Sequence, residues 1–517
     1  MLRSLRWFLW IPVVALASCG GGSTKPRPRP DIVLIVVDTL RGDVVTDIDG
    51  RYDTPHLDAL AEDGVKFSKA FAHAPLTLPS HTSLFSARPP VETVVFNNGQ
   101  PVPEALPLLA EHLRGYGYET RAVTSLGTLW SAREGVGLWR GFEDYDLDYW
   151  HMSQAEGSTA RMRASLDRRN AEKPLFMFAH YSDPHEPYNA HGTTQSEAEI
   201  YLDGEFLDRV STSEMSFWHR SLALEAGKHV FEVRSTSKFK IRQFQVFSDD
   251  GPRRWQGLEW EIGKRVSPVK NARLVLTQPG DGPAVRDLRL WINDVPDHDA
   301  IRARYAREVS YVDRWIGELV DDLKRRGIYD DALVVFTSDH GESLGEHGRV
   351  GHANGLTDPH IHVPLIIKPP KGDPRRKALA RDPGQVVSHV DVTPTVLELA
   401  SLPPLPGQIG TSLVRPHDAI HFAETHKPEA KMDKLCLRDE RYKMIYLPVV
   451  ERFLLFDLQE DPGELTDVFA ARGSERADWP DLLRALAQQA EENAANGYVP
   501  DAAAQANLEA LGYGGAN

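Results

Sequence analysis

The chain has 517 residues, of which 41% are hydrophobic and 26% charged, a composition typical of globular proteins. Its formal net charge of -15 disfavours non-specific binding to nucleic acids, so we expect no nucleic-acid partner. An anionic substrate stays open, because a bound metal ion can reverse the charge locally. The only cysteines are Cys19 and Cys436, so no framework of structural disulfides is expected, and Cys436 is predicted to be a buried strand thiol.

The N-terminal residues have the layout of an export signal, because two arginines precede an apolar run that is too short for a transmembrane helix. Residues 16–19, Leu-Ala-Ser-Cys, resemble a bacterial lipobox, in which the signal is cut before a cysteine that becomes lipidated. We therefore predict a lipoprotein signal peptide at 1–18, a lipid on Cys19 and a flexible tether at 19–30. The expected location is the bacterial cell envelope, in the outer membrane or facing the periplasm. The alternative is an ordinary signal peptide and a soluble secreted protein.

Apolar strands alternate with helices over most of the chain. The β-branched run Ile32–Val37 predicts a strand buried on both faces, as in a parallel sheet. Similar strands are predicted at 175–179, 332–337 and 363–367. The clearest helix runs from about 299 to 326, with one apolar face. The alternation predicts a three-layer α/β domain formed by residues 31–188 and 299–414.

Two segments break this alternation. Residues 189–298 show short β patterns and no convincing helix, which predicts an inserted β-sandwich-like module. We favour a module that decorates or borders the active site over a carbohydrate-binding module that stacks sugars on Trp218, Trp255 and Trp260. Residues 415–517 predict a small α+β subdomain with a helix from about 478 to 493. Its strands are expected near 419–422, 443–447 and 453–456.

Metal-binding side chains follow two of the predicted strands. Asp38 follows the first strand, and Asp339 and His340 follow the third. Sites in open α/β sheets form at the carboxyl ends of strands, so these side chains should converge. Each one alone is more often a turn or helix-cap residue, but their joint placement favours a metal site.

The segment Thr77-Leu78-Pro79-Ser80-His81 indicates the start of a helix. Pro79 suits the first helical position, so Thr77 is expected just before the helix, where free N–H groups favour an anion. A hydroxyl at that place is a candidate nucleophile once a metal lowers its pKa. By itself the segment is a common capping pattern.

Histidines supply candidates for proton transfer. His185 lies in the loop after the second strand and is a candidate general acid or anion ligand, with an ordinary polar loop as the alternative. His352 follows the Asp339 turn and is predicted to lie in the site. Other nearby histidines are expected around the site or on the surface: His347, His360 and His362.

Several motifs occur in the order and surroundings seen in sulfatase-like proteins: Asp38-Thr39-Leu40-Arg41, Thr77–His81, Asp183-Pro184-His185, Ser338–Glu342 and Gly345–Gly348. The chain resembles the sulfatase family of the alkaline phosphatase superfamily over about residues 30–470, outside the insertion. This resemblance implies a three-layer alkaline-phosphatase-like sheet, a bound divalent metal and hydrolysis of an anionic ester.

The chain departs from the family pattern at the nucleophile. The sulfatase signature needs a Cys or Ser at position 77, oxidised to formylglycine, and an Arg at position 81, where this chain has Thr77 and His81. No formylglycine is therefore expected. Thr39 replaces the second Asp of the usual pair, and His340 replaces the usual Asn. The set instead resembles the one-metal sites of lipoteichoic acid synthases and phosphoethanolamine transferases, where a threonine is the nucleophile, and half of the two-zinc site of nucleotide pyrophosphatases.

The resulting hypothesis is a metal-dependent ester hydrolase. One divalent metal, with Mn²⁺ or Zn²⁺ favoured and Ca²⁺ or Mg²⁺ open, would be held by Asp38, Asp339, His340 and the Thr77 oxygen. The catalytic set is Thr77 as the nucleophile, His185 or His352 as the acid, and His81. A threonine cannot expel sulfate by elimination, as a formylglycine hydrate can, so a phosphate mono- or diester is preferred.

Three alternatives stay open. The first is a sulfuric ester hydrolase proper, similar to arylsulfatases. The second is a non-catalytic surface lipoprotein whose β insertion binds glycans. The third is a transferase that builds an envelope polymer, although such relatives usually carry several transmembrane helices, which this sequence does not show. A glycan or another envelope component is the expected kind of substrate, and neither the natural substrate nor the oligomeric state follows from the sequence.

Overall fold

The computed structural model describes residues 29–46, 50–129, 137–146, 153–186, 188, 197–211, 216–247, 258–262, 269–278, 282–294, 298–416, 420–427 and 432–496. Cys19, the predicted signal peptide and nearly all of the predicted tether lie outside these residues. Among the described helices, none is long and apolar enough to cross a membrane.

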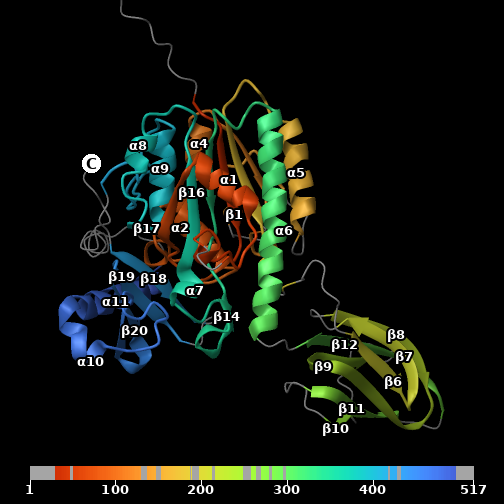
Figure 1. Cartoon of the computed structure of the whole chain (residues 1–517). Coiled ribbons are helices and arrows are strands. Elements are labelled where there is room, and N and C mark those ends of the chain that lie inside the picture. Colours follow the sequence, from red (N-terminus) through yellow and green to blue (C-terminus); the bar gives the residue numbers. More distant parts are fainter. Residues whose placement is uncertain are drawn as a thin grey trace, which may run out of the picture.

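An eight-stranded sheet forms the centre of the molecule (Figure 1). Its strands, in spatial order, are β17 (Val386–Ser388), β2 (Val65–Phe71), β16 (His362–Lys368), β13 (Leu333–Thr337), β1 (Ile32–Val37), β5 (Leu175–Tyr181), β3 (Glu119–Val123) and β4 (Asp144–Asp146). All the predicted strands are present. However, β16 runs antiparallel to both neighbours, whereas the remaining strands are parallel. An apolar run buried on both faces does not reveal strand direction, which explains this difference from a purely parallel sheet.

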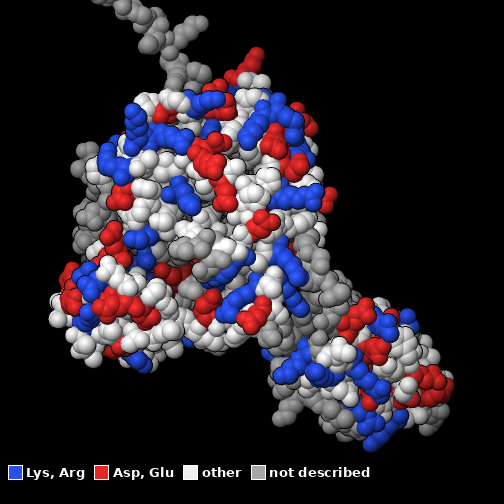
Figure 2. All heavy atoms as spheres, in the orientation of Figure 1, with Lys and Arg blue, Asp and Glu red and all other residues white. Residues whose placement is uncertain are grey.

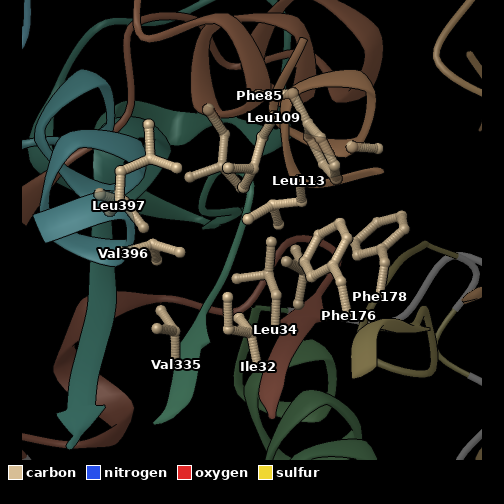
Figure 3. Packing of buried hydrophobic residues seen from close by; sticks show 14 of the residues in the cluster. Ile32, Leu34, Phe85, Leu109, Leu113, Phe176, Phe178, Val335, Val396 and Leu397 are labelled. Atoms are coloured by element: carbon tan, nitrogen blue, oxygen red, sulfur yellow. The ribbon is translucent and has the colours of Figure 1, made fainter. Parts of the chain in front are cut away.

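Helices cover both faces of this sheet. Alternate side chains of β1 belong to two hydrophobic clusters, one on each face of the sheet. The first cluster packs against α2 (Thr77–Ser86), α4 (Leu109–Gly115) and α9 (Val392–Leu399). The second packs against α1 (Pro55–Asp63), α5 (Ala155–Asp167) and α6 (His298–Arg325). Figure 3 shows part of the first cluster, in which Ile32 and Leu34 lie beside Phe176 and Phe178. The three-layer α/β architecture is therefore confirmed.

The longest helix, α6, follows its predicted bounds closely. The residues on its predicted apolar face are all buried: Tyr305, Val309, Val312, Ile316, Leu319 and Leu323. Gly327 ends the helical segment with φ +68°, the left-handed conformation that favours glycine after a helix. Short helices elsewhere are α3 (Pro90–Thr93), α7 (Asp358–Ile361) and α8 (Arg376–Leu379).

Residues 197–294 form a separate antiparallel assembly of strands near the amino end of α6 (Figure 1). Its strands are β6 (Glu197–Leu202), β7 (Glu205–Ser211), β8 (Ser216–Leu224), β9 (Gly227–Phe247), β10 (Leu258–Ile262), β11 (Val269–Gln278) and β12 (Ala284–Asp294). Trp218 is buried in the core of this assembly, so it does not offer a face to a sugar. Trp255 and the side chain of Trp260 lie outside the described residues.

The C-terminal residues add a four-stranded antiparallel sheet, formed by β18 (His421–Thr425), β19 (Lys434–Arg438), β20 (Tyr442–Leu447) and β21 (Arg452–Asp457). The helix α11 (Trp479–Asn496) packs on it, and α10 (Phe469–Arg472) precedes that helix. Cys436 is a buried strand thiol, as predicted. The division of the chain into domains at 189–298 and 415–517 stays a prediction.

Acidic and basic side chains are interspersed on the face of the molecule in Figure 2. The parallel strands of the main sheet direct their carboxyl ends toward the side of the molecule that carries β14 (Ser343–Leu344) (Figure 1). The short pair of β14 and β15 (Val350–Gly351) lies at the carboxyl-end side, beside the start of α6.

Candidate functional site

Three neighbouring strands bring polar side chains to one edge of the sheet. β1 pairs in parallel with β13 on one side and with β5 on the other. Asp38 follows β1, Asp339 follows β13, and His180 lies near the end of β5. All three side chains are fully buried. The predicted convergence of Asp38 with Asp339 and His340 is therefore present, and His180 joins it.

A strained turn orients the Asp339 carboxylate. Thr39 has φ +58°, a left-handed conformation that is rare for a β-branched residue and costly unless the surroundings impose it. In that conformation the Thr39 N–H donates to Asp339 Oδ1 at 3.1 Å, and the His340 N–H donates to the same oxygen at 2.8 Å. The other oxygen, Oδ2, is left for another partner.

Thr77 enters the site from α2. Its Oγ1 donates to Asp38 Oδ2 at 3.4 Å, and its side chain is buried. The helix begins at Thr77, with Leu76 at the N-cap, so the prediction that it begins at Pro79 was wrong by two residues. Proline is tolerated throughout a first helical turn, because N–H groups there have no intrahelical acceptor. Thr77 thus lies inside the first turn of α2.

Two histidines present lone pairs to the site. His81 Nδ1–H donates to the Thr77 carbonyl at 2.8 Å, and His340 Nδ1–H donates to the Gly341 carbonyl at 3.0 Å. A proton on Nδ1 leaves Nε2 as the acceptor, and this is the form in which imidazole binds metals. Neither Nε2 atom has a hydrogen-bond partner among the described residues.

The donor set fits a divalent cation. Ligand atoms of Asp38, Asp339 and His340 all lie within 4.8 Å of one another. Within the described part of the chain, four buried atoms around this point that can bind a cation lack a hydrogen-bond partner: Asp38 Oδ1, Asp339 Oδ2, His340 Nε2 and His81 Nε2. Unpaired buried polar atoms are costly, so their concentration here points to a ligand that satisfies them.

The electrostatics of the two carboxylates support the same conclusion. Burial, and then the charge of Asp339, raise the pKa of Asp38 well above its usual range. Burial also opposes ionisation of Asp339, but the imidazole of His340 and its histidine neighbours lower the pKa of Asp339 to about 2. A divalent cation would relieve the repulsion between the two carboxylates.

His352 and His185 lie next to this centre. The ring centroids of His340 and His352 are 4.7 Å apart, and those of His352 and His185 are 4.9 Å apart. His352 Nδ1 hydrogen bonds to the buried Glu342 carboxylate at 3.2 Å. Burial lowers the pKa of His352, but Glu342 raises it above its ordinary value overall. Burial, and then His352, lower the pKa of His185.

The three remaining histidines have other surroundings. His347 is exposed. His360 is buried and hydrogen bonds to Thr357 Oγ1 at 2.9 Å, and His362 hydrogen bonds to the Ser68 carbonyl at 2.9 Å. None of these contacts involves the carboxylates of the candidate metal site.

Three further residues of the site are not among those predicted from the sequence: Ser80, His180 and Glu342. Ser80 Oγ donates to the Asp339 carbonyl at 2.5 Å and lies 3.2 Å from His389 Nδ1. His180 directly follows the predicted strand at 175–179, but only the pairing of β5 with β1 places it beside Asp38. Glu342 was not predictable from the sequence, because only the turn between β14 and β15 brings His352 into contact with it.

A three-layer α/β fold with carboxylates, histidines and a hydroxyl buried at the carboxyl ends of its strands is typical of one class of metal-dependent hydrolases. The sulfatase family model matches residues 30–402, and a model of the C-terminal region of N-sulphoglucosamine sulphohydrolases matches residues 345–492. The chain belongs to the sulfatase family of the alkaline phosphatase superfamily, and it is a sulfuric or phosphoric ester hydrolase.

The relatives include enzymes of both ester types. A choline-sulfatase of Rhizobium meliloti is 26% identical over 481 residues, covering 85% of this chain and 82% of the relative. An N-acetylglucosamine-6-O-sulfatase of Bacteroides thetaiotaomicron is 22% identical and covers 94% of this chain and 90% of the relative. The structure of a phosphonate monoester hydrolase of Agrobacterium radiobacter matches with a TM-score of 0.59 and 21% identity, covering 89% of this chain and 96% of that chain.

Proposed function

We propose that this protein is a metal-dependent hydrolase of a phosphate mono- or diester, with Thr77 as the nucleophile. The observation that carries the proposal is the Thr77 hydroxyl beside Asp38, at the start of a helix, within a buried group of unpaired metal-binding atoms. The free N–H groups of a first helical turn favour an anion at that place.

Asp38, Asp339, His340 and the Thr77 oxygen would hold the metal ion. Imidazole among the ligands favours Zn²⁺ or Mn²⁺ over Ca²⁺ or Mg²⁺. When bound, the ion would lower the pKa of the Thr77 hydroxyl and neutralise charge on the ester. The Nδ1–H bond from His340 to Gly341 holds that ring with Nε2 directed into the site.

The chain's own residues would carry the reaction. The Thr77 hydroxyl first releases its proton to water. A bond then forms from the Oγ1 alkoxide to the central atom of the ester while the bond to the leaving oxygen breaks. His352 protonates the leaving oxygen, with Glu342 holding its Nδ1–H. His185, half-buried against His352, supports its ring. A water molecule then attacks the threonine ester, and His352 accepts its proton, which returns Thr77 and the acid to their starting forms.

The choice of phosphorus over sulfur depends on how the covalent intermediate breaks down. Threonine has one hydroxyl, so the intermediate is released only by a second attack at the central atom. This route is familiar for phosphothreonine. A sulfate ester hydrolase is the second candidate, supported by relatives such as the choline-sulfatase.

We also propose that the protein is exported and anchored through a lipid on Cys19. The described chain enters the sheet at the amino end of β1, and Asp38 lies at its carboxyl end (Figure 1). A tether at residues 19–30 would therefore leave the site directed away from the membrane, toward a glycan or another envelope component. Metabolic labelling with a radioactive fatty acid should mark the protein, and a Cys19→Ser variant should be unmarked and released from membranes.

The proposed function is tested by measuring the turnover of three substrates by the metal-loaded protein: an aryl sulfate, an aryl phosphate and a bis-aryl phosphodiester. Turnover of a phosphoester that is lost in a Thr77→Ala variant is the expected result. Turnover of the sulfate alone would contradict the preference for phosphorus. An inactive protein that retains metal and binds sulfated or phosphorylated glycans would favour a binding scaffold.

A further inference from the structure

His180 is a buried histidine at the site that the proposed mechanism does not use. It lies in β5, paired with Val36 of β1, two residues before Asp38. Its ring packs against that of His81, with centroids 5.2 Å apart, and against Phe178, two residues earlier in the same strand. The side chain is fully buried, so the position of its ring is fixed by packing and by Ser125.

Ser125 assigns the tautomer of His180. The Ser125 backbone N–H donates to His180 Nδ1 at 3.4 Å, and Ser125 Oγ lies 2.9 Å from the same nitrogen. A backbone N–H can only donate, so Nδ1 accepts and the ring proton lies on Nε2. This arrangement is the reverse of His81 and His340, whose Nδ1–H groups donate to carbonyl oxygens.

The Nε2–H of His180 has no hydrogen-bond partner among the residues that the structure describes. Asp38 Oδ2 lies 3.8 Å from His180 Nε2, which is beyond hydrogen-bond distance. A buried N–H without an acceptor destabilises the protein, and this cost is offset only if an acceptor occupies the space in front of the N–H. That space adjoins Asp38 Oδ2, which also accepts from the Thr77 hydroxyl.

We propose that His180 is a further catalytic residue, whose Nε2–H donates to a non-bridging oxygen of the bound ester, and that Ser125 is the positioning residue that keeps the proton on Nε2. This inference rests on the proposed function and specifies how the site recognises its substrate. The ligand it requires is a tetrahedral oxyanion next to the Thr77 oxygen, with one non-bridging oxygen facing β5.

The three histidines differ in the ligands that they can bind, because their tautomers differ. His81 and His340 present lone pairs, which suit a cation, whereas His180 presents a proton, which suits an anion. A fixed donor aimed at the position where negative charge develops needs no reorganisation during the reaction. Removing one such donor lowers kcat by about 10²–10³-fold in enzymes that stabilise an oxyanion.

The test compares His180→Ala with His180→Gln, using orthovanadate as a probe of the oxyanion position. We expect His180→Ala to lower kcat by about 10²–10³-fold and to weaken vanadate inhibition by a similar factor, with unchanged metal content by atomic emission. His180→Gln restores an N–H donor and should recover part of both. Ser125→Ala should give a smaller loss in the same direction, and His219→Ala, on the exposed face of the inserted module, should match the wild type.

Two results would overturn the proposal. One is loss of metal from His180→Ala, which would make His180 a ligand. The other is a kcat and a vanadate inhibition constant within about threefold of the wild type. If His180→Ala does not fold, His180→Gln and Ser125→Ala decide the matter by the same two readouts. Wild-type protein that binds vanadate but cleaves no ester would contradict the proposed function and leave vanadate binding to test His180. Wild-type protein that binds no vanadate would contradict both.

Discussion

Two buried polar clusters in this molecule differ in how their charges are satisfied. The catalytic cluster consists of Asp38, Thr77, Asp339 and His340, at the carboxyl edge of the main sheet. The docking cluster consists of Asp358, Lys443 and Glu464, where α7 meets the C-terminal sheet. Lys443 is fully buried, lies 2.7 Å from Glu464 and is paired with Asp358, whose N–H donates to Glu464 at 2.6 Å.

The difference separates a structural arrangement from a functional one. In the docking cluster each charge faces an opposite charge, so the fold itself satisfies it. In the catalytic cluster the carboxylates face each other, and each retains an oxygen that has no hydrogen-bond partner in the described part of the chain. Burial of like charges destabilises the protein unless a cation binds between them. The catalytic cluster is therefore a site built for a ligand.

The largest effect is expected at the nucleophile. Thr77→Ala should lower kcat by at least about 10³-fold, because the covalent step loses its attacking oxygen. Bound metal, measured by atomic emission, should persist through the remaining ligands. Thr77→Ser keeps a hydroxyl and should stay measurably active. Activity in Thr77→Ala near that of the wild type would exclude Thr77 as the nucleophile.

The second effect concerns the metal. Asp339→Asn removes a charge from the pair of facing carboxylates, and we expect the purified variant to hold little metal. Added Mn²⁺ or Zn²⁺ should raise the melting temperature of the wild type, since a ligand that binds only the folded state stabilises it. The same addition should leave the melting temperature of Asp339→Asn unchanged. Equal metal content in the two proteins would place the ion elsewhere.

The third prediction addresses the docking cluster. Lys443→Ala leaves the buried Glu464 carboxylate without its cation, while Arg438 still pairs with Asp358, and it should lower the free energy of unfolding by about 3–5 kcal/mol in urea titrations. Lys371→Ala breaks a pair with Asp330 in which both side chains are largely exposed, and it should cost less than about 1 kcal/mol. Equal losses in the two variants would show that burial does not distinguish these pairs.

The smallest effect is on the pH dependence. His352 must be protonated to act as an acid, so kcat falls as the pH rises through its pKa. Glu342 raises that pKa, against the opposing effect of burial. Glu342→Gln should therefore move the alkaline limb of the kcat profile to lower pH. A limb that moves to higher pH, or not at all, would assign the acid to another residue.

Much of the fold and of the metal site could be predicted from sequence periodicity and the order of motifs. Asp38 and Asp339 were found because each follows an apolar strand, and strands of a parallel sheet end at one edge. The direction of β16 was not predictable, because both of its faces are buried. The start of α2 depends on Leu76 taking the N-cap position, which the proline at residue 79 obscured.

Other residues were missed because their roles arise from tertiary contacts. His180 belongs to the apolar run of β5, and only its pairing with β1 shows that it faces Asp38. Glu342 contacts His352 only because the β14–β15 turn brings these two residues together, although they are ten residues apart in the sequence. Such contacts depend on the geometry of turns that periodicity does not describe.

The most direct test of the account is to detect the covalent intermediate. The metal-loaded protein is mixed with a bis-aryl phosphodiester and quenched in acid, and its peptides are analysed by mass spectrometry. We expect an aryl phosphoryl group on Thr77, in a peptide that is unmodified when the substrate is omitted or replaced by a non-cleavable analogue. Turnover of the diester without any modification of Thr77, or with the modification on another residue, would contradict it.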